Sequence, residues 1–573
     1  MTAIISALDN YTPIQSGEKG HIEYAWSNSI REKIIQFSFQ VTRTDKNGVN
    51  ALEEKLSEML FILKNNVVNS SHLERQMAKE LLSILYRMIG YTRDIIDGKG
   101  ECTLTYMMIY TWYKFFPQLA FFSLKCLVDL GDKNIHQYGS WKDIKYFCEY
   151  CKNKYEDLSH PLIQYSVQLI NEKLKQDILP ETPNVSLLAK WVPREKSNFG
   201  WLYETLACDY FKEIMETANT DERKRKAVLK CKTQYRKILS WLNAHIDTLQ
   251  IKQCNKTWSE IDFNNVTSIS LSKQKHAFLN TKKDGTIRYP DNQDRIICAE
   301  KFHERIKQAV AGEVNMKGKR VGMADFVKQA YDIFSQDERD LLNSQWRDNS
   351  SQTGALGKMI AMVDVSGSME GDPMNVAIAL GIRISEKSTL GNRIMTFSST
   401  PTWINLDSCD DFVSKVDVIR RAPWGMNTNF REALKMILDA VVLNKIAPKD
   451  VQDMVLVVLS DMQMDQGDSC NKKVLYEEMK QQYEQAGIRV HGEPYKLPHI
   501  LFWNLRSTSG FPCLSNQTNC SMMSGFSPSL LNFFCEHGLD ALQSFTPWSV
   551  LEKTLENNRY KIMSDRLEEE IEI

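Results

Sequence analysis

The stretch Lys358-Met-Ile-Ala-Met-Val-Asp-Val-Ser-Gly-Ser-Met369 joins a short apolar run to a series of small polar residues. The apolar part, residues 358–363, is too short for a stable helix and is rich in Ile, Met and Val, which is typical of a buried parallel strand. The polar part carries Asp364, Ser366 and Ser368, spaced one residue apart. Because ligands of open α/β sheets bind beyond the carboxyl ends of the strands, the stretch predicts a strand that opens into a ligand-bearing loop.

The side chains of this loop indicate a hard cation. Carboxylate and hydroxyl oxygens are ligands that Mg²⁺ and Mn²⁺ prefer, whereas zinc sites usually contain Cys or His, which the stretch lacks. Gly367 permits a tight turn between the two serines. We therefore expect Mg²⁺ or Mn²⁺ here. The alternative is an α/β domain in which Asp364 and Ser366 only cap a helix.

The D-x-S-x-S spacing resembles the first loop of the metal-ion-dependent adhesion site in von Willebrand factor A domains. That family has two further ligand loops, and both have counterparts here. Thr428 precedes a stretch typical of a helix, and Asp461 follows the apolar run 454–459. The resemblance implies that the ion is held by Asp364, Ser366, Ser368, Thr428 and Asp461. It also implies an open coordination position that an acidic residue of a partner completes.

Alternating strand and helix patterns after residue 355 predict a doubly wound α/β domain. Beyond the first strand, we expect strands at 392–397, 402–406, 454–459, 499–505 and 520–525, and helices at 374–387, 411–420, 430–444, 474–485 and 530–536. A short antiparallel edge is expected between Phe397 and Trp403. The alternation resembles that of a von Willebrand A-like (Rossmann-like) domain.

Amphipathic patterns dominate residues 31–345. Apolar residues at intervals of three and four predict helices at 71–90, 106–130, 141–155, 162–174, 201–218, 223–245 and 298–310. Few alternating stretches separate them, so this part is predicted to be mostly α-helical. A HEAT-like array is one arrangement, but the residues show no strict repeat period, and the stacking stays open.

A chain of 573 residues exceeds what one core usually holds, so a multidomain protein is expected. The predicted parts are a loosely ordered polar lead-in (1–30), an α-helical scaffold domain (31–345), the A-like domain (355–550) and a C-terminal helix or tail (551–573). A linker is expected near 341–357. The Glu-rich end from Arg566 is expected to be a solvated helix end or a disordered tail.

Several local strings resemble an uncharacterised family of plant and large-virus proteins, in which a helical region precedes a von Willebrand A-like domain. These strings are Arg93-Asp94 with Gly98-Lys-Gly-Glu101, 138–144, 235–242, 258–263, 501–506 and 524–527. The resemblance covers roughly residues 20–550. The layout is more remotely similar to that of the Ro ribonucleoprotein, whose helical repeats bind RNA beside an A domain.

The string from Arg93 to Glu101 lacks the two-ended frame of a phosphate-binding loop. It predicts a turn between two helices, with Arg93 and Asp94 paired locally.

A basic helix in the scaffold predicts RNA contacts. Arg223, Lys226, Lys230 and Lys237 share one face at helical spacing, and Tyr235 and Trp241 offer rings on which bases could stack. The alternative is an ordinary solvated face with core aromatic residues.

The composition identifies no binding partner, and the sequence does not indicate that the protein is exported. The formal net charge is -1, so the whole molecule has no strong attraction to nucleic acid or anionic membranes. The N-terminus lacks a signal-peptide pattern, and charged residues interrupt the most apolar region, 106–130. The 13 cysteines show no disulfide spacing, and Cys148 and Cys151 lack a second pair for zinc. We expect a cytoplasmic protein without a membrane partner.

The expected function is that of a non-enzymatic scaffold that engages a protein partner through a divalent ion and also binds RNA. Two alternatives stay open. Glu370, Asp372 and Asp465 lie near the ligand loops, as in a metal-dependent phosphoryl transferase or nuclease, although no His or Lys is spaced as a general base. The other alternative is a protein-interaction adaptor that binds no RNA.

Overall fold

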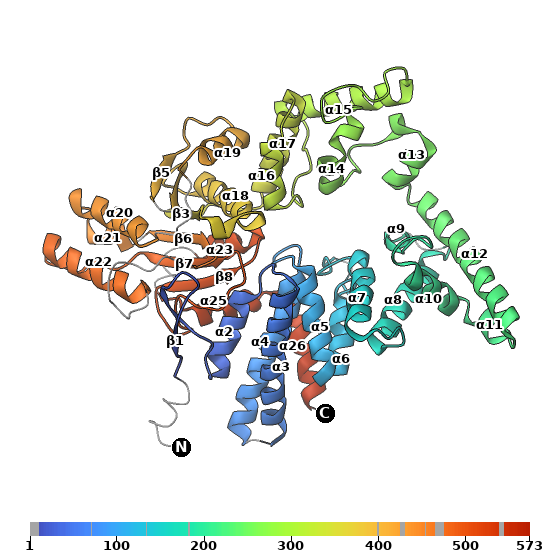
Figure 1. Ribbon diagram of the computed structural model, residues 1–573, viewed down its shortest axis with the longest axis horizontal. Coiled ribbons are helices and arrows are strands. Elements are labelled where there is room, and N and C mark those ends of the chain that lie inside the picture. Colours follow the sequence, from blue (N-terminus) through green and yellow to red (C-terminus); the bar gives the residue numbers. More distant parts are fainter. Residues whose placement is uncertain are drawn as a thin grey trace.

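The computed structural model describes residues 11–69, 71–132, 134–180, 184–397, 400–423, 430–452, 454–463, 475–537 and 544–572. A long series of helices precedes a six-stranded sheet, and the last helix returns to pack against the first ones (Figure 1). The chain combines a helical part with an α/β part, as predicted.

The sheet of the α/β part has the strand order β5-β4-β3-β6-β7-β8. All pairs are parallel except that of β4 with β5, which forms the predicted antiparallel edge. The strands are β3 (Met359–Asp364), β4 (Arg393–Phe397), β5 (Thr402–Asn405), β6 (Val455–Ser460), β7 (His499–Asn504) and β8 (Cys520–Ser524). Every residue of β3, β6 and β7 is buried, which explains why these strands are continuous apolar runs.

Helices connect these strands or follow the last one, and each begins within two residues of a predicted start, except for the short helix at 448–452, which was not predicted. They are α18 (Asp372–Lys387), α19 (Phe412–Arg420), α20 (Phe430–Leu443), α21 (Pro448–Gln452), α22 (Leu475–His491) and α23 (Asn532–His537). The first of them packs closely on β3. A Cβ added at Gly381 would lie 2.6 Å from Cγ2 of Val363, so only glycine allows this approach.

The helical part forms an arch that starts and ends at the sheet (Figure 1). Helices α2 to α5 lie beside the sheet, α7 to α12 lie further out, and α16 and α17 return to pack against α18 and α19. The bounds are α2 (Ile30–Gln40), α3 (Lys46–Asn69), α4 (His72–Arg93), α5 (Cys102–Phe115), α6 (Pro117–Cys126), α7 (Trp141–Tyr155), α8 (Pro161–Asp177), α9 (Leu188–Trp191), α10 (Gly200–Tyr210), α11 (Lys212–Glu216), α12 (Asp221–His245), α13 (Leu249–Asn255), α14 (Ser268–Phe278), α15 (Gln293–Ala311), α16 (Met323–Tyr331) and α17 (Gln336–Ser350).

Two of the predicted helices are each divided into two in the structure. The helix predicted at 106–130 is divided into α5 and α6, because Pro117 cannot continue a helix but fits the first turn of the next one. The helix predicted at 201–218 is likewise divided, at Phe211. In contrast, the predicted start Ser71 is the N-cap of α4, and its side chain forms a capping box with Glu74; the helix ends at Arg93, three residues beyond the predicted end.

The linker predicted near 341–357 was also wrong, because α17 occupies residues 336–350. Although α17 is polar in composition, it has a buried face: Trp346 is 4% exposed and Asn349 is 1% exposed. Arg383 of α18 donates to the Asn349 side chain at 2.8 Å and stacks 4.5 Å from the Trp346 ring centroid. The polar residues of α17 therefore join the arch to the α/β part.

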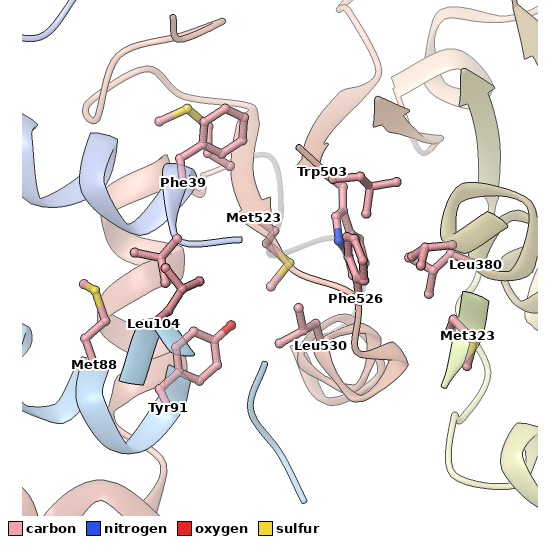
Figure 2. Close-up of a cluster of buried hydrophobic side chains, with 14 of the residues drawn as sticks. Phe39, Met88, Tyr91, Leu104, Met323, Leu380, Trp503, Met523, Phe526 and Leu530 are labelled. Carbon is pink, nitrogen blue, oxygen red and sulfur yellow. The ribbon is translucent and has the colours of Figure 1, made fainter. Parts of the chain in front are cut away.

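One hydrophobic core runs through both parts of the chain. Figure 2 shows Phe39 of α2 and Tyr91 of α4 on one side of Met523 of β8, with Trp503 of β7 on the other. A smaller separate core lies among α14, α15 and α17. The predicted limits at 30, 345, 355 and 550 stay predictions, since apolar packing is continuous between the helical and α/β parts.

The string from Arg93 to Glu101 forms the connection between α4 and α5, as predicted, but Arg93 and Asp94 are not paired with each other. Arg93 makes a bidentate ion pair with Asp143 of α7, at 2.8 Å for both bonds. Asp94 accepts two bonds of 2.7 Å from Arg559. The adjacent residues point to different neighbours because each is buried against another helix.

Both ends of the described chain are more ordered than predicted. Within the lead-in, β1 (Ile14–Ser16) and β2 (Ile22–Tyr24) form a hairpin, and Tyr24 exchanges two backbone hydrogen bonds of 3.0 Å with Phe511 of the α/β part. At the other end, α25 (Pro547–Leu555) and α26 (Asn558–Glu572) pack against α4. Leu567 is 2% exposed, so the predicted solvated tail is a helix with one buried face.

Replacing Arg559 by leucine should cost about 3–5 kcal/mol of stability, because it leaves the carboxylate of Asp94 buried without its cation. The matched change Lys561→Ala removes an exposed ion pair of the same helix and should cost less than about 0.5 kcal/mol. Chemical denaturation measures both. Equal effects of the two substitutions would contradict this role of Arg559.

Candidate metal centre

The order of the strands determines where a ligand site can form. The chain runs outward in one direction from β3 to β4 and β5, and in the other direction from β6 to β7 and β8. The strand order therefore reverses between β3 and β6. At such a reversal, open α/β sheets bind their ligands in the crevice outside the carboxyl ends of the strands. Asp364 ends β3 and Ser460 ends β6, so two predicted ligand loops begin at this crevice.

Asp364 is fully buried at the carboxyl end of β3. Its Oδ1 accepts a hydrogen bond of 2.9 Å from the backbone nitrogen of Ser366, and its Oδ2 accepts one of 2.6 Å from Oγ of Ser460. The first bond fixes the turn after β3, and the second joins β3 to β6. Both carboxylate oxygens therefore have a defined orientation.

The two serines of the first loop converge. Oγ of Ser366 lies 3.2 Å from Oγ of Ser368, at the start of the short 3-10 helix Gly367–Met369. Ser366 is fully buried, whereas Ser368 is partly exposed. The loop thus runs from the buried carboxylate outward to solvent. Thr428, the ligand predicted from the second loop, lies outside the described residues.

Asp461 is fully buried beside the first loop and has a cationic partner. Its Oδ1 accepts from the backbone nitrogen of Gln463 at 3.1 Å, and its Oδ2 accepts from Nε of Arg506 at 2.9 Å. Arg506 also donates to Glu18 at 3.0 Å, and the backbone nitrogen of Glu18 donates to the Gln463 side chain at 2.8 Å. The N-terminal hairpin therefore touches the site.

Arg506 and Glu18 are site residues that were not predicted from the sequence. Arg506 lies two residues beyond the end of β7, a position that a doubly wound sheet brings to the same edge as Asp364. Its place after a predicted strand was a usable signal. Glu18 gave no such signal, because it reaches the site only through the docking of the hairpin.

The electrostatics of the crevice favour an added cation. Burial, together with the negative charge of Asp461, raises the pKa of Asp364 to about 6, although hydrogen bonds from Ser460 and Ser366 oppose the rise. Burial alone would lower the pKa of Arg506, but Asp461 and Glu18 raise it. Arg506 thus compensates Asp461, while Asp364 has no cation among its hydrogen-bonding partners in the described residues.

These residues fit a hard divalent ion. An anionic carboxylate, a second carboxylate and two converging hydroxyls provide oxygen donors only, which suits Mg²⁺ or Mn²⁺. In the described part of the chain, no three His, Cys, Asp or Glu side chains form a metal-binding group, so an ion here would depend on the hydroxyl oxygens. Cys148 and Cys151 are fully buried and are not joined by a disulfide bond.

The additional acidic residues considered for catalysis are not all directed at the crevice. Asp372 is paired with Lys328 of α16 and lies 3.9 Å from Arg43, at the side where the arch meets α18. Glu370 is exposed. Asp465 lies outside the described residues.

The predicted RNA-binding residues lie on the outer face of α12. All four predicted residues, Arg223, Lys226, Lys230 and Lys237, are exposed, which agrees both with the RNA-binding prediction and with an ordinary solvated face. Only Lys226 among these four has a described ion pair, with Glu222 at 2.7 Å. Tyr235 was wrong as a stacking platform, because it is fully buried and donates to Asn171 at 3.0 Å.

Comparisons with known proteins match the chain in two segments. Residues 165–352 match the family described as "Domain of unknown function (DUF2828)", and residues 358–568 match the one described as "Domain of unknown function (DUF7788)". "Uncharacterized protein L728" of Acanthamoeba polyphaga mimivirus is 28% identical over 495 residues, which are 83% of this chain and 79% of the viral protein. The matches fit an uncharacterised family of the large-virus type. The second segment begins at Lys358, where the ligand-bearing stretch begins.

The described residues include helices of up to 25 residues. None of those helices is both long and apolar enough to cross a membrane.

The substitution Asp364→Asn should stabilise the ion-free protein at high pH. The raised pKa means that the folded state holds the proton of Asp364 more tightly than the unfolded state does. Wild-type stability should therefore fall as the pH rises from about 4 to about 6, by on the order of 3 kcal/mol, and remain low above that. The asparagine variant lacks this loss.

Thermal unfolding in EDTA between pH 5 and pH 8 measures the difference between the two proteins. The melting temperature of the variant, relative to that of the wild type, should increase as the pH rises. If the melting temperatures of the two proteins change with pH in the same way, the charge of Asp364 is compensated in the folded state.

Proposed function

We propose that the protein is a non-enzymatic binding scaffold whose α/β part is a von Willebrand A-like domain with an adhesion-type divalent-metal site. The observation that carries the proposal is the buried carboxylate of Asp364, held with its acceptor atoms oriented at the crevice between β3 and β6. A buried carboxylate without a cation is costly, and a divalent ion would remove that cost.

In this proposal, a bound Mg²⁺ or Mn²⁺ would offer an open coordination position to an acidic side chain of a protein partner. Asp364, Ser366, Ser368 and Asp461 would hold it, together with Thr428 from the second loop. The hydrogen bond from Ser460 holds the Asp364 carboxylate in position, and the partial exposure of Ser368 gives the partner access.

Two observations support binding rather than catalysis. Arg506 compensates one of the two carboxylates, and Asp372 is paired with Lys328 at the arch. A metal-dependent phosphoryl transferase or nuclease would be better served by several free carboxylates around the ion. That activity is the alternative to test by incubation with Mg²⁺ and labelled RNA, DNA and phosphomonoesters. Turnover abolished by Asp364→Asn would favour the enzyme.

RNA binding by the helical part is the second proposed function. The layout of the chain is remotely similar to that of the Ro ribonucleoprotein, whose helical repeats bind RNA. It is supported by the exposed basic face of α12, on which Arg223, Lys230 and Lys237 have no ion pair among the described residues.

The free thiols suit the reducing cytoplasm, which we propose as the location. A pure protein-interaction adaptor is the alternative without RNA.

Calorimetric titration with Mg²⁺ and Mn²⁺ tests the metal site. Saturable binding is expected for the wild type, with loss in Asp364→Asn and weakening in Ser368→Ala, because these remove a charged and a neutral donor. Asp372→Asn is the matched control, since it removes a nearby carboxylate that is paired elsewhere. Loss of binding only in the control would place the ion at another site.

The double substitution Arg223→Glu with Lys230→Glu tests the α12 face. RNA affinity should fall at least tenfold, and the salt dependence of binding should weaken, because phosphate contacts release counterions. Filter binding across a salt series measures both quantities. The exposed Lys449, replaced by glutamate, is the control on the α/β part. Equal effects of the two variants would leave the α12 face without a role.

A further inference from the structure

Three lysines converge on one tryptophan where α7 meets α9. The Nζ atoms of Lys142, Lys145 and Lys190 lie 5.8, 5.9 and 5.7 Å from the ring centroid of Trp191. Lys142 and Lys145 also lie 5.4 and 4.7 Å from the ring of Tyr146. We call these five residues the α7/α9 patch.

The positive charges of the α7/α9 patch are not compensated by neighbouring acids. No ion pair is found for its three lysines within the described ranges. The acidic residues close by in sequence have other partners: Asp143 binds Arg93, Glu149 accepts from the Trp201 indole, and Glu195 binds Lys232 and Arg236.

The proximity of these cations has an electrostatic cost. Burial lowers the pKa of Lys145, and the charge of Lys142 lowers it further. Burial also lowers the pKa of Lys190. A bound anion would relieve the repulsion between Lys142 and Lys145 and would stabilise the charged form of Lys190, so the patch is suited to an anionic ligand.

The aromatic residues specify the anion further. Tyr146 is 41% exposed, and its ring meets that of Phe199 edge-on, with centroids 5.4 Å apart and planes at 84°. Trp191 is also partly exposed. Lysines interleaved with exposed aromatic rings characterise surfaces that bind single-stranded nucleic acid, where phosphates contact the cations and bases stack on the rings. An acidic peptide would use the lysines but would leave the rings without a role.

We propose that the α7/α9 patch binds single-stranded RNA, with a phosphate among Lys142, Lys145 and Lys190 and a base stacked on Tyr146 or Trp191. The inference rests on the RNA-binding half of the proposed function, but assigns it a surface distinct from the basic face of α12. Helix α9 packs against both α7 and α12 (Figure 1), and Asn243 of α12 donates to the carbonyl of Ala189 at 3.0 Å. The two surfaces therefore belong to one packed unit of the scaffold.

Fluorescence anisotropy of the full-length protein with a fluorescein-labelled 12-nucleotide oligouridylate tests the proposal. The variant Lys145→Gln with Lys190→Gln should lose at least about tenfold in affinity, and its slope of log K against log salt should fall by about 1.4 for two phosphate contacts. Tyr146→Ala should lose about five- to tenfold with an unchanged slope, because it removes stacking but no charge.

Matched controls lie on the α/β part of the chain. Lys449→Gln with Lys480→Gln removes two exposed lysines, and Trp403→Ala removes a tryptophan that is 44% exposed. Both should leave binding unchanged. Thermal unfolding of every variant confirms that only folded proteins are compared.

Competition separates the possible ligands. If uridine 5′-monophosphate displaces the oligonucleotide, a free nucleotide is sufficient for binding at this site. If it does not, the site requires the polymer. Polyglutamate displacing the RNA equally well, with no effect of Tyr146→Ala, would overturn the proposal in favour of an acidic peptide.

Two further results would also overturn the proposal. The first is that the wild-type protein does not bind the oligonucleotide at low salt. The second is that only the α12 variant, Arg223→Glu with Lys230→Glu, loses affinity for it. The second would leave the proposed RNA-binding function intact at α12, so the two failures are distinguishable.

Discussion

The buried ammonium group of Lys99 is the interaction on which the arrangement of the two parts depends. Its Nζ donates to the carbonyl oxygens of Ser38 and Val41 at 2.8 and 2.9 Å and to Oγ of Ser524 at 2.7 Å. These partners are the end of α2 and the last residue of β8. Burial lowers the pKa of Lys99 to about 7, although Glu101 opposes this. One side chain thus joins the α4–α5 connection, the first helix and the edge strand of the sheet.

This junction determines which part of the sheet edge is free. The carbonyl of Phe39 accepts from Asn504 at 3.0 Å, and the side chain of Gln40 accepts from the backbone of Thr508 at 2.6 Å. The end of α2 therefore covers the carboxyl ends of β7 and β8. The crevice between β3 and β6 stays outside this cover, with Gly367 exposed and Ser368 partly exposed. In our account, the helical part leaves the metal loop as the accessible portion of that edge.

The sequence predicts the sheet better than it predicts the junction. Continuous apolar runs such as 359–363 are visible in the chain, because fully buried strands must be apolar on both faces. The polar helix α17 and the returning helix α26 were missed or misjudged, because their burial depends on partners far away in sequence, such as Arg383 and Asp94. The same holds within the site: Asp364 follows from local spacing, whereas the contact between Arg506 and Glu18 arises only from tertiary docking.

The central claim is that a divalent ion binds at the crevice between β3 and β6. Anomalous diffraction from crystals soaked in Mn²⁺ tests it directly, since Mn²⁺ takes the same oxygen ligands as Mg²⁺ and can be located by its own signal. The account predicts a peak roughly 2–2.3 Å from oxygens of Asp364 and of the serine hydroxyls, within ordinary coordination distance. A peak bound only by Asp372 or other surface acids, or no peak at an ion concentration that saturates the calorimetric titration, would contradict it.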